Sequence, residues 1–537
     1  MPKPPKLPVG IQTFEQLREE GYLYVDKTGY LIDMIDNGKF YFLSRPRRFG
    51  KSLTISTFDA LFSGKRELFM GLAAEEFFER PDFRPRPVIR LDMSEVSAIE
   101  GREALFSRMM MLLERNADIH GVAFRGVSPQ EALARLIWDV SAAKGPAVVL
   151  IDEYDSPLLD VFDDHDKSAS IREIMRDFYK QIKAADERLC FVFITGISKF
   201  SRMGVFSAMN NILDVSVDKK YGAMLGYTEE ELISNFSAHI DATAREMNTE
   251  RGELMSRVED YYDGFSFDGI TRLYNPYSTL YFFQRRDFLN YWFESGTPSF
   301  IAKYMKDLNL TVEQFRGTGV SKDFAVSPGE IENASAASFL YQSGYLTLRP
   351  GTADDYSLDY PNREVLVSMS RLLTENIFSG HDEPSSYRNI ILRCLAGRDA
   401  EGVVEQFNRI LSAIPYDDFA GAARASVREH GYKFSPAEWL YRSTLLAYLR
   451  GVGVNVEAEL HSGRGRADMV VAHKGRVWVM ELKIARDGAD ASRLADGALA
   501  QIAEMGYAER YVGAVMLGMV IDDAKRSITE YRVRTGG

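Results

Sequence analysis

One stretch of the sequence, "RPRRFGKS", carries the residue types that hold the phosphates of a nucleotide. It matches the phosphate-binding pattern G-x-x-x-x-G-K-[ST] except that Arg45 stands at the first glycine, and Pro46 is expected to enforce the bend instead. Gly50 lets the backbone curl, Lys51 can reach the β- and γ-phosphates, and Ser52 can ligate Mg²⁺. We expect nucleotide contacts from Arg45, Arg47, Arg48, Phe49, Gly50, Lys51, Ser52 and Leu53.

A second stretch, "VVLIDEYD", places two acids at the end of an apolar run. After a phosphate-binding loop, such a pair is typical of nucleotide hydrolysis. Asp152 is expected to hold Mg²⁺ together with Ser52, and Glu153 to polarise the attacking water as a general base. The run "LCFVFITG" ends at Thr195, which we predict to orient that water from a strand between the other two. The alternative is a pair of solvated acids at a strand end.

A third group of chemistry-bearing residues lies near the end of the sequence. Asp468 opens the run "DMVV", and after a turn at Lys474-Gly475 the run "RVWVM" leads into Glu481-Leu482-Lys483. Alternation along a strand puts Glu481 and Lys483 on one face. If the two runs pair as a hairpin, Asp468 comes beside them. The two carboxylates would then bind Mg²⁺, and Lys483 would orient or activate a water beside a phosphodiester.

The elements that must position these residues can be read from the pattern of apolar residues. Continuously apolar strands are expected at 40–43, 147–152 and 189–196, with helices from Thr54 and over "ASIREIMRDFYKQIKAADE". Strands of this kind alternating with helices predict a parallel α/β sheet covered on both faces. Residues 228–335 read mainly as helices. The aromatic "YNPYSTLYFFQRRDFLNYWF" is interpreted as a core helix rather than a base-stacking surface, with Asn275 and Pro276 as its cap.

Two further segments complete the organisation. The order helix, strand, turn, strand, helix over 336–373 is compatible with a winged helix whose wing is the turn at Pro350–Asp355. A packing hairpin is preferred over a DNA contact there. From Trp439 one helix is followed by a strand-rich block. We predict three domains: a P-loop ATPase at 1–230, a helical and winged-helix-like region at 231–430, and a restriction-endonuclease-like α/β domain at 431–537.

Composition excludes several classes of protein. With 45% apolar residues the 537-residue chain can build real cores, and its two cysteines, Cys190 and Cys394, exclude a disulfide framework. The first residues lack a secretory h-region, and no apolar run reaches the roughly 20 residues of a membrane span. We therefore expect a cytoplasmic protein that does not enter membranes. The net charge of −12 argues against non-specific coating of nucleic acid but leaves a local basic groove open.

Several motifs in order, "YVDKT", "RPRRFGKS", "LIDEYD", "TGISKFS" and "YNPYS", resemble the bacterial AAA-ATPase-like family over roughly residues 6 to 280. The arginine-rich loop is that family's own variant. The resemblance implies ATP and Mg²⁺ as cofactors and a homo-oligomer in which a neighbour's arginine completes the site. Arg202 is one of several candidates for that arginine. It also implies a nuclease-like domain at the C-terminus.

The tail resembles the PD-(D/E)xK nuclease superfamily, which implies a catalytic set of Asp468, Glu481 and Lys483. The same resemblance suggests a further acid, Glu459, and a helical glutamine, Gln501. Arg464 and Arg466 would lie near the metal ions, while His461 is more simply explained as structural.

Together the resemblances imply an ATPase coupled to a Mg²⁺-dependent nuclease. The expected substrate is nucleic acid, and DNA is preferred over RNA. A role in defence or mobile-element handling would be analogy alone. The alternative is a nucleotide-driven switch or scaffold whose nuclease-like domain binds DNA or a partner without cutting. A small-molecule kinase would leave residues 440–537 unexplained.

Overall fold

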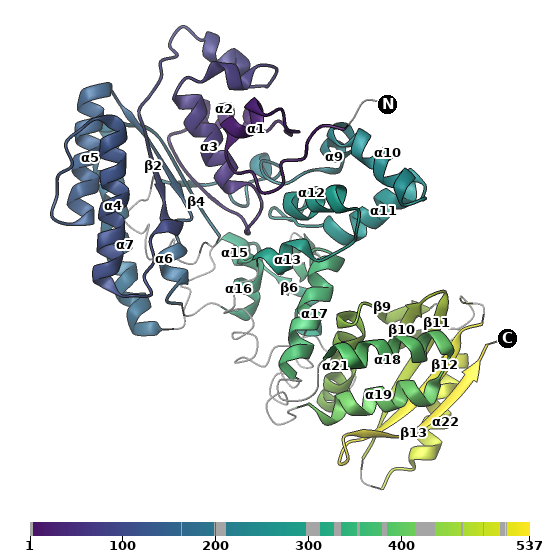
Figure 1. Cartoon of the computed structure of the whole chain (residues 1–537). Helices are drawn as coiled ribbons and strands as arrows, with labels where there is room; N and C mark the ends of the chain where they lie inside the picture. Colours follow the sequence, from purple (N-terminus) through teal and green to yellow (C-terminus); the bar gives the residue numbers. More distant parts are fainter. Residues whose placement is uncertain are drawn as a thin grey trace. The chain divides into compact units, whose positions relative to one another are not determined.

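The chain divides into two compact units, which are described separately. The computed structural model describes residues 4–162, 164–197, 199, 211–296, 312–326, 335–351, 355–377, 384–414, 435–462, 465–486, 488–504, 511 and 513–536. One unit comprises Met1–Gly296 with Gly319–Asn362, and the other Thr297–Thr318 with Arg363–Gly537 (Figure 1). The three-domain division of the sequence stays a prediction.

The first unit is built on a five-stranded sheet in the order β2-β3-β4-β1-β5, and every neighbouring pair is parallel. This confirms the predicted α/β class, and β4 lies between β1 and β3 as expected. The strands are β1 (Phe40–Ser44), β2 (Val88–Asp92), β3 (Ala147–Asp152), β4 (Leu189–Gly196) and β5 (Leu213–Asp214).

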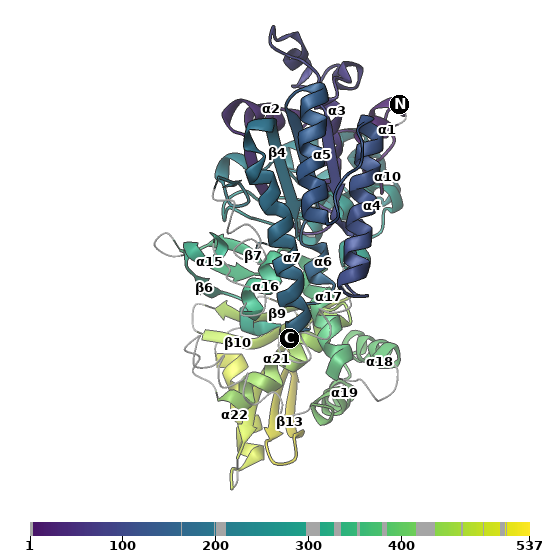
Figure 2. The ribbon, with the colours of Figure 1, turned by 90° about the vertical axis from the view of Figure 1, so that its left-hand side faces the viewer.

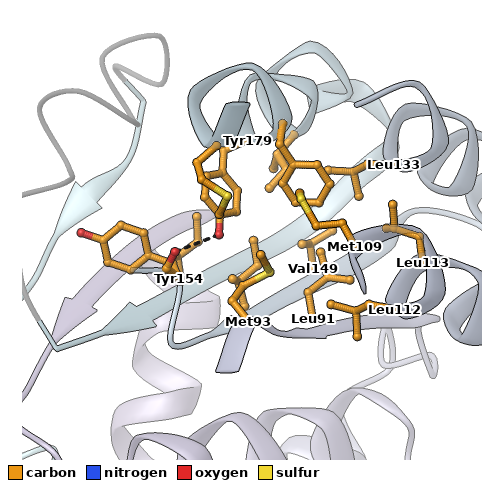
Figure 3. Packing of buried hydrophobic residues seen from close by; sticks show 14 of the residues in the cluster. Leu91, Met93, Met109, Leu112, Leu113, Leu133, Val149, Tyr154 and Tyr179 are labelled. Carbon is orange, nitrogen blue, oxygen red and sulfur yellow. Dashed lines mark hydrogen bonds between the residues drawn. The ribbon is translucent and has the colours of Figure 1, made fainter. Parts of the chain in front are cut away.

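Helices cover both faces of this sheet, which explains the unbroken apolar strands. Val149 and Ile151 of β3 pack into a cluster with the helices α4 (Arg102–His120), α5 (Pro129–Lys144) and α7 (His165–Ala184). These helices lie in front of the sheet in Figure 2, and Figure 3 shows the side chains between them. The alternate residues Val148 and Leu150 pack on the other face against α2 (Thr28–Asn37) and α3 (Lys51–Phe62). Every residue of β3 is therefore buried between two layers of helices.

Shorter helices complete the first unit. The aromatic segment forms a buried cluster, with Phe282 and Phe283 at its centre, as the core-helix interpretation predicted. The remaining α-helices are α1 (Phe14–Glu19), α6 (Ser156–Leu159), α9 (Glu229–Asn235), α10 (Ser237–Glu246), α11 (Arg251–Tyr262), α12 (Pro276–Arg285), α13 (Tyr291–Gly296), α15 (Lys322–Val326) and α16 (Ala336–Gln342). Short 3₁₀ turns in this unit span Arg66–Phe69, Glu75–Glu79, Met93–Glu95, Asp186–Arg188 and Lys219–Tyr221.

The predicted hairpin of the middle region is present. β7 (Thr347–Pro350) and β8 (Tyr356–Asp359) pair antiparallel after α16, and β6 (Thr318–Val320) lies at the boundary between the units. The hairpin packs on the preceding helical region, since Thr347 Oγ1 accepts a 2.7 Å hydrogen bond from the backbone N–H of Ser266. Part of the expected wing, residues 352–354, lies outside the described residues.

The second unit holds a five-stranded mixed sheet in the order β13-β12-β11-β10-β9, with only β11 and β12 parallel. One face packs on α18, α19 and α21, and the other on α22. The helices are α17 (Arg363–Ile377), α18 (Pro384–Gly397), α19 (Ala400–Ser412), α21 (Pro436–Gly451) and α22 (Ala491–Glu504), with a 3₁₀ turn at Glu313–Phe315. The strands are β9 (Asn455–Ser462), β10 (Gly465–His473), β11 (Arg476–Ala485), β12 (Val515–Asp522) and β13 (Ser527–Thr535).

The hairpin of β10 and β11 turns where the sequence predicted. Lys474 and Gly475 both have positive φ, 46° and 71°, as a two-residue hairpin turn requires. Among the helices that the structure describes, none combines the length and apolar character needed to cross a membrane.

Candidate functional sites

The phosphate-binding loop joins β1 to α3, between a strand and a helix as predicted. Gly50 precedes α3 with φ at 97°, a left-handed conformation that a residue without a Cβ adopts freely. Arg48 adopts a left-handed φ of 66° without that freedom. The backbone N–H groups in the first turn of α3 therefore open toward the loop, where they favour an anion.

Lys51 begins α3 and is buried, with 5% of its surface exposed. Its ammonium donates hydrogen bonds to the carbonyls of Arg45 at 2.9 Å and Pro46 at 3.0 Å. Burial lowers the pKa of Lys51, and the nearby carboxylates of Glu153 and Asp152 act in the opposite direction. The loop therefore wraps a cation whose nearest opposite charges lie at the end of β3.

Asp152 and Glu153 stand at the carboxyl end of β3. Asp152 is 1% exposed, its Oδ1 accepts from the backbone N–H of Glu153 at 3.0 Å, and the Ser52 side chain is among the groups that act on the pKa of its carboxyl. Glu153 has a left-handed φ of 48°. Burial raises the pKa of both carboxyls. The buried Asp152 and the partly buried Glu153 lie near Lys51 and, with the Ser52 hydroxyl, offer the oxygen ligands that Mg²⁺ prefers.

A cavity of about 470 Å³ lies beside this group. Its polar wall comes from the loop and from the carboxyl ends of the strands: Arg47, Arg48, Gly50, Lys51, Ser52, Ser94, Glu153 and Ser156. The other lining residues are mostly apolar or aromatic and come from the N-terminal segment, α1, α3 and the helical region: Pro8, Gly10, Ile11, Gln12, Leu17, Leu53, Tyr227, Pro276, Tyr277 and Leu280. The size and this division of character fit a nucleotide, with phosphates on one side and a base on the other.

Arg45, Phe49 and Thr195 were predicted to contact nucleotide, but their side chains make contacts away from the cavity. The Arg45 guanidinium is buried and donates to the carbonyls of Ser44, Ser216 and Tyr221. Burial lowers its pKa to about 10. Phe49 packs edge-on against Phe265 and Phe267.

Thr195 also bonds within the sheet, because its Oγ1 donates to the carbonyl of Leu43 at 2.7 Å. Arg45, Phe49 and Thr195 are absent from the cavity lining, so a direct role in binding nucleotide stays a prediction. Arg202 lies outside the described residues.

The aromatic wall was missed by sequence reasoning. Tyr277 follows Pro276 at the start of α12, and the Asn275 side chain caps that helix by accepting from Ser278 N–H at 3.0 Å. The predicted cap is thus confirmed. The "YNPYS" motif was the available signal, since its Pro-Tyr pair lines the cavity directly.

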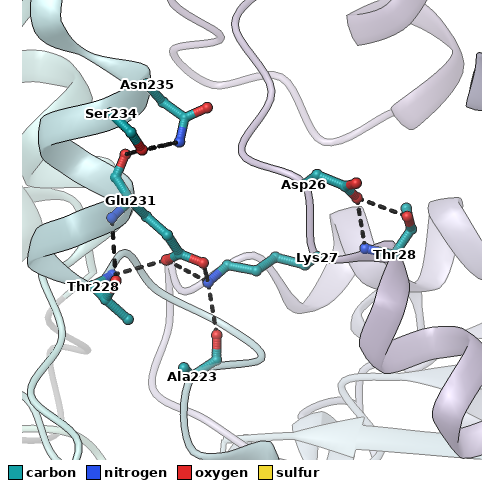
Figure 4. Close-up of polar contacts among 8 residues, drawn as sticks. All are labelled: Asp26, Lys27, Thr28, Ala223, Thr228, Glu231, Ser234 and Asn235. Atoms are coloured by element: carbon teal, nitrogen blue, oxygen red, sulfur yellow. Dashed lines mark hydrogen bonds and ion pairs between the residues drawn. The ribbon is translucent and has the colours of Figure 1, made fainter. Parts of the chain in front are cut away.

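Thr228, the residue after Tyr227, belongs to a polar network that includes the "YVDKT" motif (Figure 4). Lys27 bonds to both carboxylate oxygens of Glu231, at 2.5 and 2.6 Å, and to the carbonyl of Ala223 at 2.7 Å. Glu231 and Thr228 form a reciprocal capping box at the start of α9, one residue after Tyr227. The motif therefore positions a cavity wall instead of lining it.

In the second unit, the predicted acids meet where two strands part. The antiparallel pairing of β10 with β11 ends at Met469 and Met480, although β11 continues alongside β12 to Ala485. Asp468 fills the opening: its Oδ2 accepts from the backbone N–H of Leu482 at 2.8 Å, and its own N–H points to Glu481 Oε2 at 3.4 Å. The two carboxyls therefore lie side by side.

Lys483 and Gln501 complete a connected group with Glu481. The Lys483 ammonium lies 3.0 Å from Glu481 Oε1 and donates to Gln501 Oε1 at 2.7 Å, and Gln501 Nε2 donates to the same glutamate oxygen at 2.5 Å. Burial, followed by the charge of Asp468, raises the pKa of Glu481 to about 7. A cation between the two acids would relieve this repulsion, so the donor set fits Mg²⁺.

Two residues near these acids were not predicted. Arg442 of α21 contacts Asp468 Oδ1 at 3.3 Å, and burial followed by the Asp468 charge raises the pKa of Glu438, also on α21. Glu438 lies three residues after Ser435, whose side chain caps α21 by accepting from the Glu438 N–H. In the sequence, this acid therefore looks like an ordinary residue of a helix start. A helix-start motif thus concealed an acid that faces the site.

For the other site residues predicted near the C-terminus, the structure gives at most the position of the backbone. Glu459 lies on β9 between the paired positions Ala458–Met469 and Leu460–Ala467, which puts it opposite Asp468 in register. The side chains of Glu459, His461 and Arg466, and all of Arg464, lie outside the described part of the chain. Within that part, no group of three or more His, Cys, Asp and Glu side chains is arranged to hold a metal ion.

Comparisons with known proteins match a segment of each unit. A family model described as predicted AAA-ATPase matches residues 8–206, and one described as PD-(D/E)XK nuclease superfamily matches residues 437–531. A protein of Azotobacter chroococcum mcd 1, named "Uncharacterized protein in vnfD 5'region", is 32% identical over 545 residues and covers 99% of both chains. A solved structure of the Aeropyrum pernix ORC1 protein in complex with DNA aligns with 12% identity and a TM-score of 0.23, covering 66% of this chain and 92% of that one.

The fold and the two sites define a protein that joins an AAA-ATPase-like domain to a domain of the PD-(D/E)XK nuclease superfamily, as the sequence motifs predicted. The chain belongs to the family of AAA-ATPase-like proteins with this C-terminal domain, a family that it shares with the Azotobacter protein along its whole length.

Proposed function

We propose that this protein binds and hydrolyses ATP in the first unit and cleaves DNA with Mg²⁺ in the second. The observation that carries the proposal for cleavage is the connected group of Glu481, Lys483 and Gln501 beside Asp468. The cavity lined by Lys51, Ser52 and Glu153 supports ATP as the nucleotide site's ligand.

In the ATP site, the triphosphate lies along the start of α3 and the base against Tyr227 and Tyr277. Lys51 is already at the loop and exchanges its carbonyl contacts for the β- and γ-phosphates. Ser52 and Asp152 would hold Mg²⁺, which neutralises phosphate charge. Glu153 accepts the proton of the attacking water, a role favoured by a carboxyl whose pKa burial raises above its ordinary value.

In the nuclease site, Asp468 and Glu481 would hold Mg²⁺, which supplies an activated water and stabilises charge on the scissile phosphate. Lys483 extends from the same face of β11 as Glu481 and orients the water or the phosphate. Gln501 fixes the ammonium and the carboxylate relative to each other. Such preorganised charge contributes most to catalysis because it needs no rearrangement during reaction.

One contact favours a second function, a nucleotide-driven switch whose C-terminal domain binds DNA without cutting. The guanidinium of Arg442 lies on Asp468 Oδ1, where it competes with a metal ion for the carboxylate. In this alternative the arginine satisfies the acid permanently, and ATP turnover continues alone.

Incubation of the purified protein with supercoiled plasmid, Mg²⁺ and ATP separates the two functions. We expect nicked or linear DNA from the wild type, and no cleavage but normal ATP hydrolysis from Glu481→Ala and Lys483→Ala. A Lys51→Ala variant should lose ATP binding. Wild type that hydrolyses ATP but leaves single-stranded DNA, duplex DNA and RNA intact would support the switch and contradict cleavage.

A further inference from the structure

The three arginines of the phosphate-binding loop point in three directions. Arg45 is buried behind the loop on backbone carbonyls. Arg48 lies over the ring of Tyr277, with 4.9 Å between its guanidinium carbon and the ring centroid. Arg47 remains, and it lines the cavity on the wall that holds Lys51, Ser52 and Glu153.

The charge of Arg47 acts on two other residues that line the cavity, Lys51 and Glu153. Burial is the main cause of the shifted pKa of Lys51 and of Glu153, and Arg47 is among the charges that act on both, lowering each. Arg47 is therefore close to the lysine that reaches the β- and γ-phosphates and to the acid that faces the attacking water. In the proposed ATP complex both would lie beside the γ-phosphate, where charge develops during hydrolysis, and Arg47 lines the same cavity.

The backbone of Arg47 is fixed from the rear of the loop. The buried Trp292 donates its indole N–H to the carbonyl of Arg47 at 2.9 Å. Pro46 lies so close to Gly344 that a Cβ on that glycine would stand 2.6 Å from the proline ring. The Arg47 side chain is half-buried, and among the described residues its guanidinium makes no hydrogen bond or ion pair. A fixed backbone thus presents an unengaged guanidinium to the cavity.

We propose that Arg47 is a catalytic residue that contacts the γ-phosphate in the transition state, so that hydrolysis requires no arginine from a second copy of the chain. This inference rests on the proposed ATP hydrolysis and replaces the expectation of an arginine supplied by a neighbour.

The reaction is an in-line displacement. The water oxygen forms a bond to the γ-phosphorus as the bond from that phosphorus to the β–γ bridging oxygen breaks. The bridging oxygen leaves with the electron pair as part of ADP, and the water proton passes to Glu153. Negative charge on the γ-oxygens and the bridging oxygen is met by the Arg47 guanidinium, whose planar fork can bond to two oxygens at once.

The transition-state role is tested with full-length wild type, Arg47→Ala, Arg47→Lys and a control, Arg135→Ala, whose side chain is half exposed on α5 and pairs with Glu131. Calorimetry measures the binding of ADP alone and of ADP with aluminium fluoride, which mimics the transferring phosphoryl group. Steady-state assays measure kcat across about a 100-fold range of protein concentration.

We expect Arg47→Ala to bind ADP like the wild type, to lose most of the extra affinity for ADP with aluminium fluoride, and to lose at least about 100-fold in kcat. Arg47→Lys should recover only part of the loss, because an ammonium lacks the fork. Wild-type specific activity should not change on dilution, and Arg135→Ala should match it.

Two outcomes would overturn the inference alone: an Arg47→Ala variant with kcat within threefold of a hydrolysing wild type, or wild-type specific activity that rises with protein concentration. A wild type that binds ATP and Mg²⁺ but does not hydrolyse ATP would overturn the proposed ATPase itself and the inference with it.

Discussion

The ammonium of Lys483 lies 3.0 Å from Oε1 of the buried Glu481, two residues earlier on the same face of β11. Even with this cation present, burial and the neighbouring Asp468 hold the pKa of Glu481 at about 7. The acid is therefore balanced between its neutral and charged forms at physiological pH, and a metal ion would decide between them.

DNA cleavage at limiting Mg²⁺ should consequently rise with pH through about 7, since the metal must displace the proton of Glu481. A higher Mg²⁺ concentration should shift this rise in cleavage rate to lower pH, because the metal ion and the proton compete for the Glu481 carboxylate. Cleavage rates between pH 5.5 and 8.5 at several Mg²⁺ concentrations measure this. If the pH at which the cleavage rate rises does not change with Mg²⁺ concentration, a group other than Glu481 controls the rate.

The same carboxyl affects stability without metal. Its pKa is raised on folding, so its stabilising contribution is complete below the unfolded value of 4.5 and is lost as pH rises through about 7. Glu481→Gln should therefore gain in Tm relative to wild type between pH 5 and pH 8 in EDTA.

Gly518 of β12 controls how closely α22 approaches the site. It pairs with Glu481 in register, and an added Cβ would lie 2.7 Å from the backbone nitrogen of Leu499 on α22. Gly518→Ala should push away the helix that carries Gln501 and reduce cleavage about tenfold or more while ATP hydrolysis is unchanged. Gly497→Ala, on α22 with open space around it, is the matched control. Equal activity of the two variants would show that α22 does not position the site.

Tyr277 is predicted to bind the base and not the phosphates. Tyr277→Ala should weaken ATP binding by about 1–2 kcal/mol, in the range measured for an aromatic stacking partner, yet leave binding of tripolyphosphate unchanged. Calorimetry with both ligands distinguishes these effects. If tripolyphosphate affinity falls equally, the tyrosine supports the loop, and Arg48 stacked upon it, instead of the base.

Arg45 is predicted to be a structural residue. Arg45→Ala leaves the carbonyls of Ser44, Ser216 and Tyr221 without their donor and opens space beneath Phe267, over whose ring the guanidinium lies. Urea unfolding should show a loss of about 1–3 kcal/mol for each well-buried group left unpaired. Arg84→Ala, an exposed arginine, should change stability by less than about 0.5 kcal/mol. A stable Arg45→Ala protein with lost ATP affinity would instead favour direct phosphate contact.

The sequence was most informative about site residues that come directly after a continuous apolar run. Asp152 at the end of β3 and Glu481 within β11 were predicted because each directly follows a continuous apolar run, which indicates a strand. Arg45 was assigned to nucleotide from its position in the loop, but unpaired carbonyls behind the loop attract its guanidinium. Tyr227, Tyr277 and Glu438 reach their sites through tertiary packing, which no local period encodes. Glu438 also lies in the first turn of α21, where its backbone N–H donates to the capping side chain of Ser435.

The central claim is that two separate magnesium-dependent phosphate chemistries share one polypeptide. Crystals grown with a non-hydrolysable ATP analogue and Mn²⁺ in place of Mg²⁺ test it directly through anomalous scattering. The account predicts one manganese between Ser52, Asp152 and the phosphates, and at least one more between Asp468 and Glu481. Nucleotide absent from the cavity at Lys51, or carboxylates of Asp468 and Glu481 that share no ion at saturating Mn²⁺, would contradict it.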